Sequence, residues 1–247
     1  MKIKRYVFIF LFIIICLFSS NEAYGYSYGV GKIVNNERPD IGSYKNIIEK
    51  YNGYYIGKDD KSIYLTFDCG YENGYTSKIL DTLKEEEVKA CFFITGHYLN
   101  SALDLVKRMT NEGHIIGNHT NKHKHFTKES DVEILEDVRS LEEMYEAKFN
   151  QKMSSFVRPP AGEFSEDSQK LLSANSYTSV FWSLAYVDWN KDTYYGNNYS
   201  YNNVMSRIHN GAIILMHTVS KDNSTDLKKI ICDLKMNGYE FKSLYEL

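Results

Sequence analysis

The 247-residue chain has little proline, little cysteine and no excess of basic residues. Three prolines exclude a Pro-rich linker or stalk. Of the four cysteines, Cys16 lies in an apolar N-terminal run, and the other three show no close pairing, which excludes a small disulfide framework. Hydrophobic residues make up 43% and charged residues 25%, as in ordinary globular proteins, so disorder is excluded as well.

The formal net charge is −3, and no basic patch is long enough to hold a row of phosphates, so we expect no nucleic-acid partner. The chain has no Gly-rich phosphate loop and no Ser-centred nucleophile elbow, and Cys69 lacks the surroundings of a thiol-protease nucleophile. No internal repeat is present. These absences leave a globular protein that we expect to be a monomer.

The first 25 residues have the organisation of a secretory signal. Lys2, Lys4 and Arg5 precede a 12-residue apolar run at 7–18, and small residues near Gly25 follow. The run is shorter than the roughly 20 residues that span a bilayer. We therefore predict a signal peptide over residues 1–25 with cleavage near Gly25; the alternative is an uncleaved membrane anchor.

The rest of the chain predicts an α/β fold. Residues 26–60 are polar and rich in Tyr and Asn, and we interpret them as an N-terminal arm packed on a domain of residues 61–247. Six helical patterns alternate with seven short apolar runs, at 63–67, 90–94, 114–117, 155–157, 178–182, 212–216 and 239–241. Continuously apolar runs indicate strands covered on both faces, hence a parallel sheet, open or closed. The domain is short for an eight-fold barrel, for which about 250 residues are typical.

Ionisable side chains follow five of these strands. Asp68, His119, Arg158, Asp188 and His217 each lie at or beyond the carboxyl end of one apolar run. Each alone has a structural explanation, such as a turn, a surface decoration or a buried core histidine. Together they predict an active site, because the carboxyl ends of parallel strands share one face. Asp188 would contact substrate or orient a catalytic neighbour.

The types of side chain indicate metal-assisted hydrolysis of an ester or amide. His119 and His123 are four residues apart and can reach one metal ion that keeps open positions, activates water and polarises a carbonyl. Asp68 can then act as general base and His217, from another strand, as general acid. Arg158 can keep Asp68 ionised and oriented.

These residues form ordered motifs that resemble those of the polysaccharide deacetylases, the NodB-like carbohydrate esterases. The matching motifs are Thr66-Phe67-Asp68, His119-Thr120-x-x-His123, Arg158-Pro159-Pro160-x-Gly162, Asp188-Trp189 and Leu215-x-His217. The resemblance covers residues 61–247. It implies a distorted (β/α)7 barrel and a divalent metal, usually zinc with manganese or cobalt as alternatives, and it implies removal of acetyl groups from glycans.

Two longer stretches, 68–76 and 182–189, resemble one subgroup, the N-acetylmuramic acid deacetylases that lead to muramic δ-lactam in spore cortex. The resemblance implies peptidoglycan strands as partner, with the stem peptide already removed by an N-acetylmuramoyl-L-alanine amidase. It also implies export to the cell envelope or the spore intermembrane space. The alternatives are a deacetylase of N-acetylglucosamine glycan or xylan, and an inactive glycan-binding envelope module.

Carried over by motif, the resemblance gives the same roles to the base, the acid, the arginine and the two metal histidines. It adds three residues at the substrate: Trp189 and Leu215 would line the acetyl or sugar pocket, and the N–H of Ala161 would hold the oxyanion.

The chain departs from the wider family at two positions. Cys69 stands where the family has a second metal-binding Asp, so the thiolate could ligate zinc or the residue could be a spectator. Ala185 stands where many relatives have an Asp that tunes the acid histidine, which leaves the orientation of His217 open.

Overall fold

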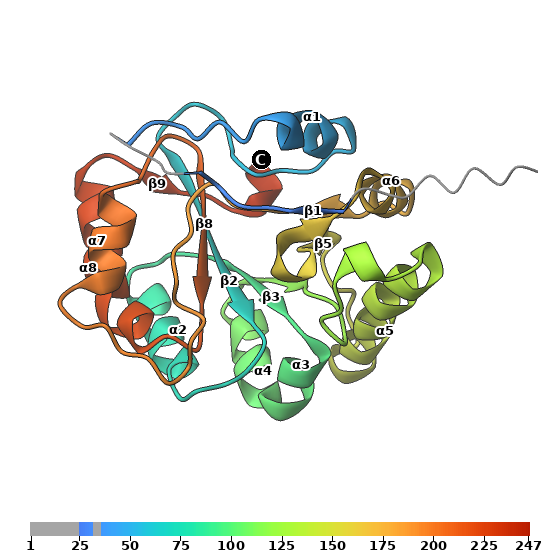
Figure 1. Ribbon diagram of the computed structural model, residues 1–247. Helices are drawn as coiled ribbons and strands as arrows, with labels where there is room; N and C mark the ends of the chain where they lie inside the picture. The colour runs from blue at the N-terminus through green and yellow to red at the C-terminus, as the bar shows by residue number, and fades with distance from the viewer. Residues whose placement is uncertain (1–24, 32–35) are drawn as a thin grey trace, which may run out of the picture.

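The computed structural model describes residues 25–31 and 36–247, and its centre is a curled parallel sheet (Figure 1). The strand order is β7-β5-β4-β3-β2-β8, and β9 pairs with the start of β2. The strands are β2 (Ser62–Cys69), β3 (Cys91–Ile94), β4 (Ile115–Asn118), β5 (Phe156–Val157), β7 (Thr178–Ser179), β8 (Ala212–His217) and β9 (Glu240–Phe241). All seven predicted strands are present, although the fifth ends earlier than its apolar run.

Helices connect the strands and cover the outside of the sheet (Figure 1). They are α1 (Ser43–Lys50), α2 (Thr76–Glu85), α3 (Gly96–Ser101), α4 (Leu103–Asn111), α5 (Asp131–Phe149), α6 (Glu166–Ala174), α7 (Tyr199–Met205) and α8 (Lys221–Met236). Short 3-10 turns lie at Phe126–Lys128, Pro160–Gly162 and Leu244–Glu246. The six predicted helices are confirmed, α5 with the Ser130–Glu133 capping box at its start. The short α1 and α3 were not predicted, and Ile208 lies beyond the end of α7.

Side-chain alternation along the strands separates two environments. On β2, Leu65 and Phe67 join the large apolar cluster beneath the helices, together with Leu80 of α2 and Leu227 of α8. Tyr64 belongs instead to a separate inner cluster with Phe93 and Ile213. Because successive strand residues point to opposite faces, Thr66 and Asp68 share the inner face with Tyr64. The inner face of β2 is therefore polar toward the carboxyl end of the strand.

The N-terminal segment packs where the sheet is least regular. Strand β1 (Tyr26–Ser27) pairs antiparallel with β6 (Glu163–Phe164), and the hydroxyl of Tyr28 donates to the carbonyl of Trp182 at 2.6 Å. Ile48 of α1 is fully buried in the same aromatic cluster. Between β7 and β8, Leu184 forms a parallel bridge to Ile214. This bridge joins the two edges of the curled sheet.

In the described ranges, no helix has both the length and the apolar character needed to cross a membrane. The predicted signal peptide lies almost entirely outside these ranges. In Figure 1, the arrowheads of β2 and β8 point away from α1 and from the C-terminus. The carboxyl ends of the strands therefore form the opposite end of the barrel.

Candidate active site

A buried ion pair lies at the centre of this end of the barrel. Asp68 is the penultimate residue of β2 and Arg158 directly follows β5, and Nη1 of Arg158 is 2.8 Å from Oδ1 of Asp68. Both residues are nearly inaccessible to solvent. Burial alone would raise the pKa of Asp68, but the Arg158 guanidinium and the nearby imidazoles outweigh it and hold that pKa below its usual range. Asp68 is therefore a carboxylate at neutral pH.

Each nitrogen of the Arg158 guanidinium has a hydrogen-bond partner. Its Nε donates to the carbonyl of Val180 at 2.9 Å, and its Nη2 donates to the hydroxyl of Thr66 at 2.9 Å and to the carbonyl of Phe181 at 3.1 Å. It also lies 4.1 Å from the ring centre of Phe93. A buried charge is tolerated when it is paired and hydrogen-bonded in this way. Arg158 thus fixes the position of Asp68 from inside the barrel.

The two predicted metal histidines face one another beside Asp68. Nε2 of His119 is 3.2 Å from Nε2 of His123 and 3.5 Å from Oδ2 of Asp68. Nδ1 of His119 lies 2.9 Å from the carbonyl of Arg158; because a carbonyl only accepts, this nitrogen carries the proton and Nε2 keeps a free lone pair. Burial lowers the pKa of both histidines, that of His123 to about 4, so both are neutral.

The loop that carries these histidines is held in an unusual backbone shape. Thr120 and His123 both have positive φ angles, 65° and 55°, which are uncommon for residues other than glycine. Asn118 Oδ1 accepts from the N–H of Thr120 at 2.8 Å, and the Thr120 hydroxyl accepts from the N–H of His123 at 2.9 Å. Asp137 of α5 accepts from the N–H of Lys122 at 2.8 Å. These bonds fix both imidazoles, and sequence reasoning did not identify Asn118 or Asp137.

The arrangement fits a divalent metal with two protein nitrogens. With Zn–N bonds of about 2.0–2.1 Å, two ligands of one tetrahedral ion lie roughly 3.3 Å apart, close to the 3.2 Å between the imidazoles. The bond from His119 to the Arg158 carbonyl is the kind of support that orients metal-binding histidines. Within the described residues, no set of three or more His, Cys, Asp or Glu side chains would hold an ion by itself.

His217 forms the other side of the site. Its Nδ1 is 2.7 Å from Oδ1 of Asp188, and its backbone N–H donates to Oδ2 of the same carboxylate at 2.8 Å. Burial would lower the pKa of His217, but Asp188 outweighs it and raises that pKa. Although Ala185 has no carboxylate, the imidazole of His217 is still oriented by one, which comes from Asp188. The half-exposed Trp189 packs edge-on against the imidazole, with ring centres 5.8 Å apart.

The other two expected substrate residues lie nearby in the fold. Leu215 lies two residues before His217 on β8, so both side chains are on the inner face. Ala161 is exposed in the turn after Arg158, with a positive φ of 54°. A left-handed alanine is strained, and such residues often mark functional sites.

Cys69 lies apart from the histidines. It follows Asp68 on β2 and therefore points to the outer face, where it is completely buried in the apolar cluster with Ile94 and Tyr98. Burial raises the pKa of its thiol well above the usual value. The possibility that Cys69 ligates the metal finds no support in this placement, and the spectator interpretation agrees with it.

Replacing Cys69 with alanine is accordingly expected to leave metal binding unchanged. The measurement is metal stoichiometry and affinity of the purified variant, by titration with Zn²⁺ after removal of metal. His123→Ala is the matched control and is expected to weaken binding strongly, because it removes one of two facing nitrogens. A loss in Cys69→Ala as large as in the control would contradict the outward placement of the thiol.

The loop after Asp68 is fixed by two side chains that sequence reasoning quoted only as part of a motif. The Glu72 carboxylate accepts from the hydroxyls of Tyr98 and Thr76. Nδ2 of Asn73 donates to the carbonyls of Lys191 at 2.9 Å and Val219 at 3.0 Å, so it ties together the loops after β2, β7 and β8.

This fixed loop presents an aromatic ring at the rim. Tyr71 is 65% exposed and packs on His97, with ring centres 4.9 Å apart. Trp189, Tyr194 and Tyr195 are exposed in the loop before α7. Exposed aromatic rings with one polar end suit contact with sugars.

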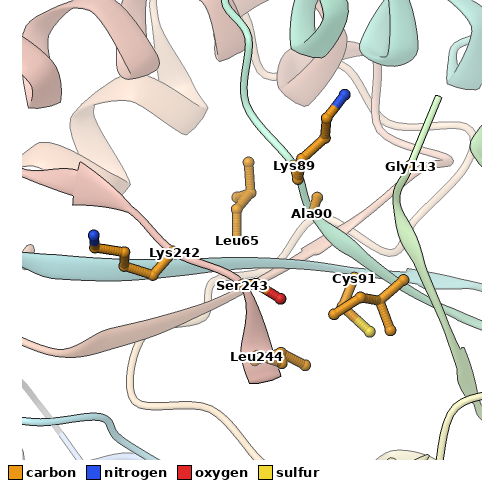
Figure 2. Close-up of a pocket in the computed structure, with 9 residues that line it drawn as sticks. Leu65, Lys89, Ala90, Cys91, Gly113, Lys242, Ser243 and Leu244 are labelled. Carbon is orange, nitrogen blue, oxygen red and sulfur yellow. The ribbon is translucent and has the colours of Figure 1, made fainter. Parts of the chain in front are cut away.

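A partly open cavity of about 100 Å³ lies elsewhere, toward the amino ends of the strands (Figure 2). Ala90 and Gly113 line it just before β3 and β4, and Leu244 lines it from the C-terminal turn. Figure 2 shows the amino groups of Lys89 and Lys242 directed away from it. The two lysines therefore do not converge on this cavity (Figure 2), whereas Asp68, His119 and His123 lie together at the carboxyl ends of the strands.

Comparisons with known proteins point the same way. Residues 56–180 match the family model described as polysaccharide deacetylase. The peptidoglycan-N-acetylmuramic acid deacetylase PdaA of Bacillus subtilis is 45% identical over 224 residues, 90% of this chain and 85% of that protein. The solved structure of Bacillus subtilis PdaA, described as a family 4 carbohydrate esterase, has a TM-score of 0.87 at 43% identity and covers 90% of this chain and 96% of that one. A peptidoglycan-N-acetylglucosamine deacetylase of Bacillus cereus is 36% identical over 205 residues, 80% of this chain and 72% of that protein.

Proposed function

This chain belongs to the polysaccharide deacetylase family, and from that premise we propose that it removes the N-acetyl group of N-acetylmuramic acid in peptidoglycan. The family and the (β/α)7 barrel predicted from the motifs are thereby confirmed, as is the class of enzyme, a deacetylating hydrolase. One observation carries the substrate proposal: the Asp68–Arg158 pair, the facing histidines and the Asp188–His217 pair meet at one end of a barrel that is similar to PdaA over nine tenths of the chain.

The geometry supports a division of labour between two protonation sites. Asp68, held ionised by Arg158, takes a proton from the attacking water through its Oδ2 oxygen. The oxygen of the water bonds to the acetyl carbon. The N–H of Ala161 donates a hydrogen bond to the oxyanion that forms. His217 then gives its Nε2 proton to the nitrogen as the C–N bond breaks, which releases acetate and a free amine. Trp189 and Leu215 border the acetyl group.

We propose that His119 and His123 hold a divalent ion, with zinc preferred and manganese or cobalt as alternatives. When bound, the ion would polarise the acetyl carbonyl and lower the pKa of water. The chain supplies two neutral imidazole nitrogens for it and no third ligand from Cys69, so the remaining positions fall to water and substrate. A site with two protein ligands is expected to release its metal readily to a chelator.

We also propose the biological setting that the subgroup resemblance implied. The substrate is a glycan strand of peptidoglycan from which an amidase has removed the stem peptide. The freed amine closes onto the lactyl carboxyl group with loss of water, which gives the δ-lactam of spore cortex. The protein acts as a monomer in the cell envelope or the spore intermembrane space after export by residues 1–25. Residues 26–60 serve as an arm of the domain at 61–247.

Acetate release from defined glycans tests this function. The purified protein, loaded with Zn²⁺, Mn²⁺ or Co²⁺, is incubated with amidase-treated peptidoglycan, intact peptidoglycan, chitooligosaccharide and acetylated xylan, and acetate and muramic lactam are measured. The proposal expects fastest release from the amidase-treated strands, from their muramic residues. Preferred release from chitooligosaccharide or xylan would favour the alternative substrates, and no release with any metal would favour an inactive glycan-binding module.

Tyr71 is expected to contribute to binding of long glycan strands. Tyr71→Ala should raise KM for long strands about 2- to 10-fold, because aromatic contacts are worth roughly 0.5–1.5 kcal/mol, and should leave kcat nearly unchanged. Tyr245→Ala is the matched control, since Tyr245 is 68% exposed but lies in the C-terminal turn near the amino ends of the strands. Equal KM changes in the two variants would remove Tyr71 from the binding surface.

A further inference from the structure

A buried amide stands directly behind the acid histidine. Asn223 lies in the first turn of α8, where its backbone N–H donates to the Ser220 hydroxyl that caps the helix. The residue is completely inaccessible to solvent. Its Nδ2 donates to Oδ2 of Asp188 at 2.6 Å and to the carbonyl of His217 at 2.9 Å. One side chain thus contacts both members of the Asp188–His217 pair.

The other end of the amide is equally occupied. Oδ1 of Asn223 accepts from the hydroxyl of Tyr186 at 2.7 Å and from that of Ser200 at 2.6 Å. A rotated amide would turn its oxygen toward a carboxylate and a carbonyl, both of which only accept hydrogen bonds. The surroundings therefore permit one orientation, and all four hydrogen-bonding positions of the amide are used in it.

Asp188 depends on this amide for its placement. The carboxylate is nearly inaccessible, and its bonds within the described residues come from His217 and Asn223. Of the charged groups near this cluster, Asp226 of α8 bonds instead to the backbone of Tyr201, and Arg207 bonds to the carbonyl of Ala185. No arginine or lysine contacts Asp188 in the described part of the chain, so its Oδ2 oxygen is held by two neutral donors, the amide of Asn223 and the backbone N–H of His217.

We propose that Asn223 is a positioning residue for the general acid: it holds Asp188 so that Nδ1–H of His217 stays bonded and Nε2–H is presented to the leaving nitrogen. The proposal rests on the proposed deacetylation. In each turnover the C–N bond breaks as the Nε2 proton moves to nitrogen, and Nδ1–H remains on the imidazole. The proton that Asp68 took from water returns to His217 through solvent, which restores both groups.

The proposal predicts a defect that depends on the leaving group. An amine leaving group must be protonated as the C–N bond breaks. The aryloxide of an activated aryl acetate leaves without a proton. Asn223→Ala is therefore expected to lower kcat for N-acetyl glycan on the order of 10- to 100-fold, part of the 10²–10⁴ that a general acid supplies. Hydrolysis of the aryl acetate should stay within about twofold of wild type. A purely structural defect would lower both activities alike.

Milder variants keep the test open if Asn223→Ala does not fold. Tyr186→Phe and Ser200→Ala together remove both donors to Oδ1, so the amide loses its fixed orientation, and the same selective defect is expected in smaller measure. Asn175→Ala is the matched control, because Asn175 is an asparagine at the C-terminal cap of α6 that bonds to Leu171 and Arg139. Equal loss of both activities in the Asn223 or the Tyr186/Ser200 variants would overturn the proposal. Wild-type activity of these variants on the N-acetyl glycan would overturn it as well.

A spectroscopic measurement separates this inference from the proposed function. The Nδ1–H proton of His217, identified by its absence in His217→Gln, should give a strongly downfield NMR resonance in the wild type because it bonds to Asp188 at 2.7 Å. Asn223→Ala should move that resonance upfield or abolish it, while Asn175→Ala should not. An unmoved resonance overturns the inference whatever the substrate proves to be; absence of acetate release in the wild type overturns the proposed function alone.

Discussion

Replacing Asp68 with asparagine is expected to lower kcat on N-acetylated glycan by about 10³-fold or more, near the upper range for removal of a general base. The amide keeps the shape of the side chain and can still accept the hydrogen bond from Arg158. It cannot take a proton from water, so KM should change little while kcat falls. The measurement is steady-state acetate release with metal content checked in the same preparation.

The control for this variant is Asp226→Asn. Asp226 is also a buried carboxylate, but it accepts from the backbone N–H of Tyr201 on α7 and does not contact the central ion pair. Its replacement should leave kcat nearly unchanged. An Asp68→Asn protein that binds metal and retains a tenth or more of the wild-type kcat would show that another group acts as base.

Replacing Arg158 with methionine is expected to lower the free energy of unfolding by about 3–5 kcal/mol, because it leaves the buried Asp68 carboxylate without its partner. Arg158→Met would also free the carbonyls of Val180 and Phe181. The measurement is urea unfolding at pH 7. In the double variant with Asp68→Asn the two losses should be much less than additive, since both act on one pair. Additive losses would mean that the pair does not couple.

The Asp68–Arg158 pair also makes the stability of the fold depend on pH in the acid range. The pKa of Asp68 is held below its usual range in the folded protein, and the unfolded value is near 3.9. The contribution of this pair to the free energy of unfolding is therefore fully present above about pH 4–5, and it is lost as the pH falls through the lower pKa of the folded protein. Unfolding measured between about pH 2 and 6 should show this loss in the wild type and a smaller loss in Asp68→Asn. The same loss in both proteins would assign the acid sensitivity to other carboxylates.

Residues at the ends of strands could be predicted, because a parallel sheet brings them together whatever its details. Asp68, His119, Arg158 and His217 lie where this rule places them. Asp188 was harder: it follows β7 by nine positions, and only the folded loop brings its carboxylate to His217. The sequence thus predicted the residue but left its partner open.

Residues that act only through buried hydrogen bonds were not predicted from the sequence. Asn223 has a helix-cap pattern around it, and nothing local indicates that its amide reaches a carboxylate 35 positions away. Asn118 and Asp137 bond to backbone groups of the loop that carries His119 and His123, and no side-chain motif records such bonds. Helices α1 and α3 were missed because eight and six residues carry too little periodicity to distinguish them from loop.

Arg158 joins the two halves of the chemistry in a single residue. Its guanidinium holds the carboxylate of Asp68, which we propose as the base, and its own carbonyl sets the tautomer of His119. Any shift of the short strand β5 moves both connections in the same event. The residue proposed as base and the first of the two proposed metal histidines therefore keep or lose their positions together.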